Sequence, residues 1–270
     1  MSATLRITVL GCGSSPGVPR IGNDWGACDP NEPRNRRTRT SILIERVTEA
    51  GATRVLVDTG PDLRQQLLAA DVRAIDAVVY THAHADHVHG IDDLRAFWLN
   101  THRLVEVYAD APTAAHLRHA FGYCFATQPG SNYPPILRHN PISAGMPFAI
   151  SGAGGSLAIV PFRQIHGEIE SLGLRVGTFA YSCDISDLPP ESVPEVEGAD
   201  LWIVDALRPR PHPSHFSLAE AVAWIQKLRV RRGVLTHMHN DLDYATTRQA
   251  LPAGIEPAYD GMVVELPLAG

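Results

Sequence analysis

The chain has 270 residues, of which 44% are hydrophobic and 19% charged, and its formal net charge is −6 at pH 7. This composition is typical of a globular protein that buries a sizeable core, and we expect residues 1–270 to form a single domain. The acidic balance argues against a large nucleic-acid partner, because such binding requires a basic surface.

The first hundred residues predict four strands and two helices. Apolar runs bounded by turn-forming residues predict strands at 5–11, 41–45, 53–58 and 74–81. Helices are predicted at 60–71, where Pro61 suits a first turn, and from about Gly90 through 91–99. The polar stretch from Ile21 to Arg39 is typical of an irregular loop.

The rest of the chain predicts strands with one well-marked helix. Residues 122–156 are rich in Pro, Gly and Ser and predict loops, with room for one edge strand. A helix is predicted at 217–229, where Ser217 and Glu220 form an S-x-x-E capping box. Strands are predicted at 156–165, 172–184, 199–206, 232–236 and 261–266. This alternation predicts a layered α/β fold.

Two halves of the sequence share a short pattern. The segments VLVDTG and THAHAD, at 55–60 and 81–86, are echoed by WIVDAL and THMHND, at 202–207 and 236–241. The echo suggests a duplicated half-unit, with chance similarity as the alternative.

The four cysteines lie far apart, without a C-x-x-C pair. A disulfide framework is therefore not expected, and a reducing cytoplasm suits the chain. The N-terminus lacks the pattern of a secretory signal, and no run approaches the roughly 18 apolar residues of a membrane span. We expect a cytoplasmic protein with no membrane partner.

The segment VVYTHAHADHVHG at 78–90 holds four of the thirteen histidines. Strand residues two apart point the same way, so His82 and His84 can converge on one ion where the strand ends. Asp86 and His87 follow at the turn toward a helix and can meet a second ion. Imidazole and carboxylate are ligands that zinc, manganese and iron accept. The alternative is a surface histidine cluster without a ligand.

The pattern H-x-H-x-D-H after a strand resembles the metallo-β-lactamase superfamily. The resemblance covers almost the whole chain, because further motifs of the family follow in order. It implies a four-layer αβ/βα sandwich of two similar halves, which agrees with the internal echo. The matching residues outside the first cluster are Asp58 in VLVDTG, His166 after AIVPFRQI, Asp184 in AYSCD and His237 in VLTHMHND.

The resemblance implies two divalent metal ions per chain, Zn or Mn, with Fe as the alternative. One ion would be held by His82, His84 and His166, and the other by Asp86, His87 and His237. Asp184 would bridge them. Asp58 would accept an N–H from a ligand imidazole and fix its tautomer. Taken alone, His166 is typical of a loop histidine and Asp184 of a turn aspartate. Their order after the first cluster is what indicates that they are metal ligands.

The stretch RPRPHPSHFSLAEA places His215 two residues before the helix cap Ser217. It resembles the extra histidine of the phosphodiesterase branch, which includes tRNase Z and the cyclic phosphodiesterase of the carbon–phosphorus lyase pathway. A histidine there suits proton donation to a leaving alkoxide. The alternative is a surface histidine packed on prolines.

Three further features bear on the branch. The segments LGCGSSPGVP, RTRTSILIE and YDGM resemble the same phosphodiesterase and the pyrroloquinoline-quinone biosynthesis B protein. Arg37 and Arg39 are candidates to meet phosphate, with a solvated position as the alternative, and Asp260 is either near the pocket or an ordinary turn residue.

The phosphodiesterase carries a cysteine-rich structural zinc site early in its chain. Here Cys28 is the one cysteine between Ile21 and Arg39, and such a site needs about four ligands, so we predict no structural zinc there.

The sequence therefore predicts a dinuclear metal-dependent hydrolase. Its expected substrate is a small cyclic phosphate or nucleotide-like phosphodiester, with Asp86 and Asp184 orienting the nucleophile and His215 protonating the leaving group. The alternatives are a thioester or lactone hydrolase of the same fold, and an oxygenase or carrier of quinone-cofactor biosynthesis. A homodimer is compatible with the sequence.

Overall fold

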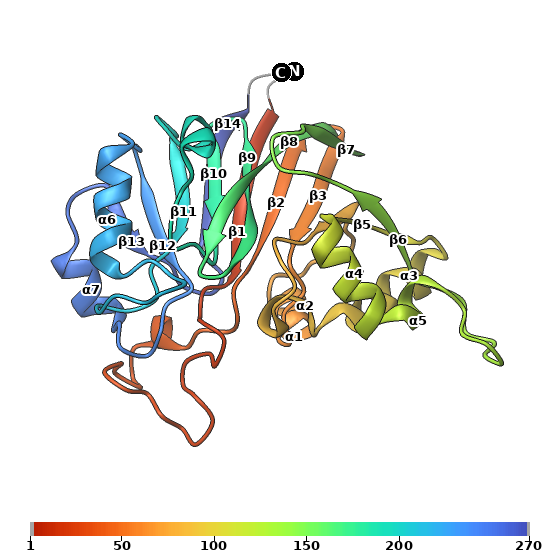
Figure 1. Cartoon of the computed structure of the whole chain (residues 1–270), viewed down its shortest axis with the longest axis horizontal. Helices are drawn as coiled ribbons and strands as arrows, with labels where there is room; N and C mark the ends of the chain where they lie inside the picture. Colours follow the sequence, from red (N-terminus) through yellow and green to blue (C-terminus); the bar gives the residue numbers. More distant parts are fainter. Residues whose placement is uncertain (1–2, 269–270) are drawn as a thin grey trace.

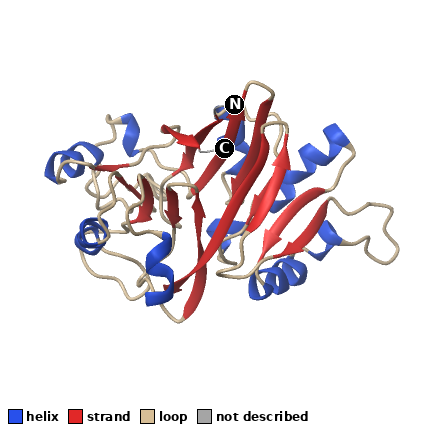
Figure 2. Cartoon of the chain, turned by 90° about the horizontal axis from the view of Figure 1, so that it is seen from above, coloured by secondary structure: helices blue, strands red, loops and turns tan. Residues whose placement is uncertain are grey.

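Two seven-stranded sheets face each other, and helices cover their outer faces (Figure 1). The computed structural model describes residues 3–268. The side chains between the sheets form one hydrophobic core, which includes Ile44 from the first sheet and Trp202 from the second. A second core, with Leu56 and Leu67, lies between the first sheet and its helices. The αβ/βα sandwich predicted from the sequence is confirmed, and Figure 2 shows its layers from above.

The first sheet has the order β14-β1-β2-β3-β4-β5-β6. The pairs within β14-β1-β2-β3 are antiparallel, and β3 to β6 run parallel. Its strands are β1 (Ala3–Gly11), β2 (Ser41–Thr48), β3 (Gly51–Val57), β4 (Ala77–Val79), β5 (Val105–Ala109), β6 (Leu137–Pro141) and β14 (Val263–Leu268).

The second sheet repeats this plan in the order β13-β12-β11-β10-β9-β8-β7. The pairs from β7 to β10 are antiparallel, and β10 to β13 run parallel. Its strands are β7 (Phe148–Gly152), β8 (Gly155–His166), β9 (Ile169–Val176), β10 (Phe179–Ser182), β11 (Leu201–Asp205), β12 (Gly233–Thr236) and β13 (Ile255–Pro257).

The helices lie on the two outer flanks, α1 to α5 beside the first sheet and α6 and α7 beside the second (Figure 1). None of those within residues 3–268 has the length and apolar character needed to cross a bilayer. Their bounds are α1 (Leu63–Ala69), α2 (Ala85–Val88), α3 (Arg95–Thr101), α4 (Ala111–Ala120), α5 (Gly122–Phe125), α6 (Leu218–Lys227) and α7 (Tyr244–Ala250), with short 3-10 helices at Pro33–Asn35, Ile91–Leu94 and Pro190–Glu195.

Most predicted elements are present, and the capping box of α6 forms as expected. The helix expected near Gly90 is split into the one-turn α2, a 3-10 turn and α3. The region 122–156, predicted as loops with one edge strand, contains α5, β6 and β7. The sequence reading also missed β5, α4, α7 and β13. The strands β5 and β13 are short, and pairing with neighbouring strands stabilises them. The helices α4 and α7 begin at the aspartate N-caps Asp110 and Asp243, local signals that the sequence prediction did not use.

Arg37 joins the irregular N-terminal loop to the segment after β12. Its guanidinium, which was expected either at phosphate or in solvent, is instead fully buried. It donates to the carbonyl oxygens of Leu242 at 2.7 Å and His239 at 3.2 Å, and to Asn35 Oδ1 at 3.2 Å. Its Nη1 lies 4.0 Å from the Cys28 thiol, so a second cation at this cysteine would meet a positive charge. The absence of a structural zinc stays a prediction.

Asp260 also links separate segments in this part of the fold. Its carboxylate accepts from the backbone N–H of Thr38 at 2.7 Å and of Cys12 at 3.0 Å. Burial raises the pKa of Asp260, and these hydrogen bonds oppose the rise, leaving it at about 6. Asp260 therefore links two loops by hydrogen bonds and is not a solvated turn residue.

We predict that Arg37→Ala lowers the free energy of unfolding by about 2–4 kcal/mol, because several buried carbonyl oxygens lose a charged donor. Urea unfolding followed by circular dichroism measures the loss. Arg36→Ala is the matched control, since Arg36 is exposed in the same loop. A loss for Arg37→Ala no larger than that of the control would refute the role of Arg37.

Candidate metal centre

Seven side chains predicted as metal ligands meet at one end of the sandwich, between the two sheets. Both sheets contribute, because the loops that follow parallel strands end at the same edge. His82 and His84 follow β4, Asp86 and His87 lie in α2, His166 ends β8, Asp184 follows β10, and His237 follows β12.

Asp184 is at the centre of the cluster. Its Oδ2 lies 3.5 Å from His82 Nε2 and 3.4 Å from His166 Nε2. Its Oδ1 lies 3.3 Å from the Nε2 atoms of both His87 and His237. The two oxygens of one buried carboxylate thus face two separate sets of imidazoles.

One further side chain completes each set. His84 Nδ1 lies 3.2 Å from His166 Nε2, on the exposed side of the cluster. Asp86 Oδ2 lies 3.5 Å from His237 Nε2 and 3.6 Å from His87 Nε2. We call His82, His84 and His166 the Oδ2 group, and Asp86, His87 and His237 the Oδ1 group.

Asp58 orients two of the imidazoles. His87 Nδ1–H donates to Asp58 Oδ2 at 2.7 Å, as the sequence led us to expect. Thr81 donates its hydroxyl to the same oxygen at 2.8 Å, and that hydroxyl lies 3.0 Å from His82 Nδ1. With the Nδ1 of each ring occupied, Nε2 is the nitrogen of each ring that faces the cluster and that a metal ion can bind once its proton has left. His166 is fixed in the same way, by the carbonyl oxygen of Ser214 at 2.6 Å.

Three residues of the site have left-handed backbone conformations. Asp58, Asp184 and His237 have φ of 62°, 55° and 56°. Each follows the end of a strand, where the turn aims its side chain between the sheets. Such conformations cost about 1–3 kcal/mol for residues other than glycine and concentrate at functional sites.

The carboxylates and imidazoles of the cluster stabilise each other's charged forms. Burial raises the pKa of Asp184, but His237 and His87 outweigh it and hold that pKa well below the usual range. Burial lowers the pKa of His237, but Asp184, Asp86 and Asp205 outweigh it and raise it to about 9. Without a metal, imidazolium protons therefore balance the buried carboxylates, and metal binding must displace those protons.

The residues fit divalent metal ions. The Nε2 atoms of His82, His87 and His237 are buried and have no hydrogen-bond partner within residues 3–268. Ligand atoms bound about 2.0–2.1 Å from one tetrahedral ion lie about 3.3–3.4 Å apart. The nitrogen–carboxylate distances of the cluster, 3.3–3.6 Å, are close to this spacing.

His215 lies beside both groups, and its ring centroid is 4.7 Å from that of His166. Its ring stacks on that of His237, with 4.9 Å between centroids and an interplanar angle of 12°. His215 Nδ1–H donates to Asp205 Oδ2 at 2.7 Å, and Asp205 is fully buried. The Nε2 of His215 makes no hydrogen bond within residues 3–268, so it is available to a substrate.

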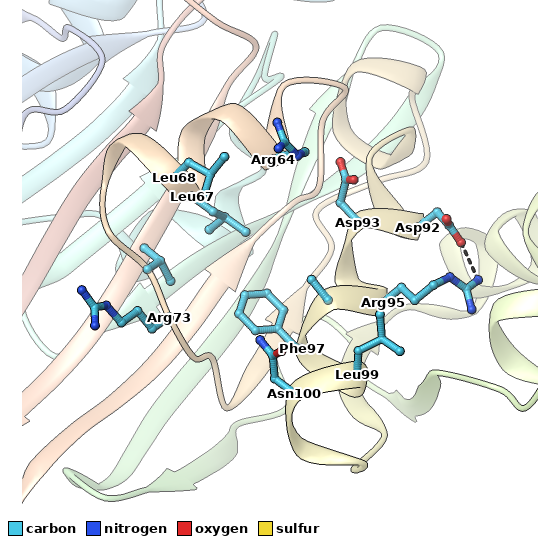
Figure 3. A pocket seen from close by; sticks show the side chains of 12 residues that line it. Arg64, Leu67, Leu68, Arg73, Asp92, Asp93, Arg95, Phe97, Leu99 and Asn100 are labelled. Carbon is cyan, nitrogen blue, oxygen red and sulfur yellow. Dashed lines mark hydrogen bonds and ion pairs between the residues drawn. The ribbon is translucent and has the colours of Figure 1, made fainter.

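The largely apolar pocket in Figure 3 is not part of this site. It has a volume of about 660 Å³ and lies between α1 and α3. Leu67, Leu68, Phe97 and Leu99 line it, together with charged residues such as Arg64. None of the seven predicted ligands reaches it, so we do not place the reaction there.

Comparison with known proteins identifies the family. A family model described as "Beta-lactamase superfamily domain" matches residues 53–238, a range that includes all seven predicted ligands. The chain belongs to the metallo-β-lactamase superfamily. It is a hydrolase of that fold, and membership implies binding of divalent metal.

The relatives of this metallo-β-lactamase-fold hydrolase have different names. The crystal structure of "a New Diphosphatase from the PhnP Family" covers 99% of both chains, with a TM-score of 0.88 and 36% identity. An octanoyltransferase of Porphyromonas gingivalis is 35% identical over 263 residues, which are 96% of this chain and 51% of that protein. The chain thus spans about half the length of this curated relative.

A more distant structure shares the fold alone. Zn(2+)-bound PqqB from Methylobacterium extorquens covers 97% of this chain and 100% of its own, with a TM-score of 0.75 and 18% identity.

Sequence reasoning missed three side chains that contact the metallo-β-lactamase site. Ser15 donates to Asp86 Oδ2 at 2.6 Å, and Thr81 links Asp58 to His82. Asp205 holds His215, and the internal echo contained its signal, since WIVDAL aligns Asp205 with Asp58. Ser15 has no comparable signal, because only the fold brings the N-terminal loop to α2.

We predict that Asp184→Ala lowers metal affinity by more than about 100-fold, because both ligand groups face its carboxylate, whereas Asp58→Ala costs about 10–100-fold by freeing a ligand ring. Competition titration with a fluorescent chelator gives both values. The reverse order would show that the ligand assignment is wrong.

Proposed function

We propose that the protein is a dinuclear metal-dependent phosphodiesterase that hydrolyses a small cyclic phosphate, nucleotide-like phosphodiester or diphosphate. The observation that carries this proposal is the position of His215. A histidine held by a buried aspartate stands directly beside a cluster suited to metals. In this position His215 can donate a proton to the oxygen that leaves during hydrolysis. Phosphate esters with poor leaving groups require such a proton donor.

The Oδ2 group and the Oδ1 group would each hold one ion, Zn or Mn with Fe as the alternative, and Asp184 would touch both. When bound, such ions supply Lewis-acid charge and activate water at neutral pH. Two donor sets facing opposite oxygens of one carboxylate favour two ions over one.

The chain's own residues would orient and move protons. Asp86 and Asp184 are buried carboxylates that accept hydrogen bonds, so they can align the attacking water. Asp205 keeps the Nδ1–H of His215 in place, and Nε2–H would then donate to the leaving oxygen. The Asp205–His215 pair has no evident task in hydrolysis of a thioester, whose leaving thiolate needs little protonation.

The comparisons support phosphate chemistry more than the alternatives. The diphosphatase matches over the whole of both chains, so its name describes a protein of the same extent. The octanoyltransferase is about twice as long as the matched segment, and its name can refer to either half. It nevertheless keeps hydrolysis of acyl thioesters as a second candidate. The PqqB likeness shows the fold alone and adds no argument for cofactor biosynthesis.

We predict two ions per chain after reconstitution with excess Zn²⁺ or Mn²⁺ and removal of unbound metal, because seven candidate ligands exceed the four of a single tetrahedral site. Elemental analysis of the dialysed protein measures the ratio. A ratio of one or less at saturation would contradict the dinuclear site.

We predict that His215→Ala retains its metal and fold but loses about 10²–10⁴-fold in kcat on a phosphodiester with an alkyl leaving group. The loss should shrink on bis-p-nitrophenyl phosphate, because p-nitrophenolate leaves without a proton. Steady-state kinetics on both substrates at matched metal content tests this.

His212→Ala is the matched control, since His212 lies on the same segment with its ring centroid 5.1 Å from that of His215. Equal losses of the His215 variant on both esters would remove the general-acid role. Hydrolysis of an octanoyl thioester that exceeds hydrolysis of every phosphate ester would favour the acyl alternative.

A further inference from the structure

A second pocket opens beside Asp86, on the side of the N-terminal loop. Its volume is about 430 Å³, within the range of small-molecule sites. Ser15, Arg20, Ile21 and Arg39 line it. It borders the metal cluster at Asp86, to which Ser15 is hydrogen-bonded. A molecule that reacts at the cluster can therefore extend into it.

Arg39 presents a fixed positive charge to this pocket. Its Nε lies 2.9 Å from Asp62 Oδ2, and its backbone N–H donates to the same oxygen at 2.8 Å. Its two terminal nitrogens make no hydrogen bond within residues 3–268. The side chain is thus held in place from one side while its outer donors remain available to a ligand.

Arg20 presents the second charge. Its Nη2 contacts the ring of His239, and its Nη1 lies 3.8 Å from Asp24, a carboxylate that is half exposed. Its Nε is buried without a hydrogen-bond partner within residues 3–268. A hairpin-like pairing of Arg20 with Asp24 through two backbone hydrogen bonds, 2.9 and 3.2 Å long, fixes this part of the loop.

Two arginines line the pocket beside the metal cluster. Asp86 is the one carboxylate in the lining, and the proposed function assigns it to a metal. Asp62 and Asp24 each lie next to one of the guanidinium groups, but the terminal nitrogens of Arg39 remain available. Because Asp86 belongs both to this lining and to the metal cluster, the arginines lie within reach of the proposed reaction centre. Arginine forks match the geometry of phosphate oxygens. Ile21, fully exposed at the same pocket, offers an apolar surface to an uncharged part of the ligand.

We propose that Arg20 and Arg39 bind a second phosphate of the substrate, adjacent to the one that is cleaved, so that the enzyme prefers diphosphate-linked nucleotides over simple phosphodiesters. This inference rests on the proposed function, because it takes the cluster as the site where the other phosphate is hydrolysed.

Two measurements on the metal-loaded full chain test the inference. The first is isothermal titration with α,β-methylene-ADP and with AMP, which differ by one phosphate. The second is the ratio of kcat/KM for ADP-ribose to that for bis-p-nitrophenyl phosphate, which lacks a second phosphate. The variants are Arg20→Gln, Arg39→Gln and the charge-retaining Arg20→Lys. Arg36→Gln, which removes the same charge from an exposed site in the same loop, is the control.

The wild type should bind α,β-methylene-ADP more tightly than AMP. Arg20→Gln and Arg39→Gln should each reduce that preference and the kinetic ratio by about 10-fold or more, in line with loss of hydrogen bonds to a charged group. Arg20→Lys should restore part of the preference, and Arg36→Gln should leave both quantities within about two-fold of wild type.

The two proposals fail in different ways. Hydrolysis of bis-p-nitrophenyl phosphate with no preference for the second phosphate, or with a preference that survives both glutamine variants, overturns the inference alone. A protein that hydrolyses no phosphate ester overturns the proposed function, and absence of tight α,β-methylene-ADP binding in that protein overturns the inference as well.

Discussion

The site depends on one buried carboxylate that is shared by four imidazoles. Asp184 lies between the sheets with its two oxygens directed at different pairs of histidines. A buried carboxylate surrounded by ring nitrogens without partners is unfavourable unless cations or protons compensate it. The same arrangement therefore explains the raised pKa of His237, the fit to metals and the strained backbone at Asp184 itself.

The fold makes this arrangement possible because each half places an aspartate next to a Thr-His pair at neighbouring strand ends. In each half an aspartate ends one parallel strand, and the next strand ends in a Thr-His pair. Asp58 bonds the backbone and hydroxyl of Thr81 and orients His87, while Asp205 pairs in register with Thr236 and orients His215. The first aspartate serves a metal ligand and the second serves the candidate acid. The two aspartates occupy corresponding places in the halves, but Asp58 has a left-handed backbone and Asp205 lies within its strand.

Much of the site could be predicted because its first cluster is local in sequence. His82, His84, Asp86 and His87 follow one strand, so strand periodicity was enough to group them. His166, Asp184 and His237 needed the order of family motifs, since nothing local brings them together. The sequence carried no sign of the left-handed backbone at three strand ends.

The N-terminal loop was the least predictable part of the fold and the site. Its contacts join residues more than 200 positions apart, as between Arg37 and Leu242. A run of arginines without regular structure has no periodic pattern that separates a buried guanidinium from a solvated one. Burial was decided by unpaired carbonyl oxygens elsewhere in the chain, which only the folded structure reveals. The same holds for Arg20, whose partner is His239.

We propose that Asp184 separates two metal positions. Anomalous diffraction at the zinc edge, on crystals of the zinc-loaded protein, tests it most directly. We expect two peaks, one on each side of the Asp184 carboxylate, the first within the Oδ2 group and the second within the Oδ1 group. A single peak at full loading, or two peaks of which either makes no contact with Asp184, would contradict it.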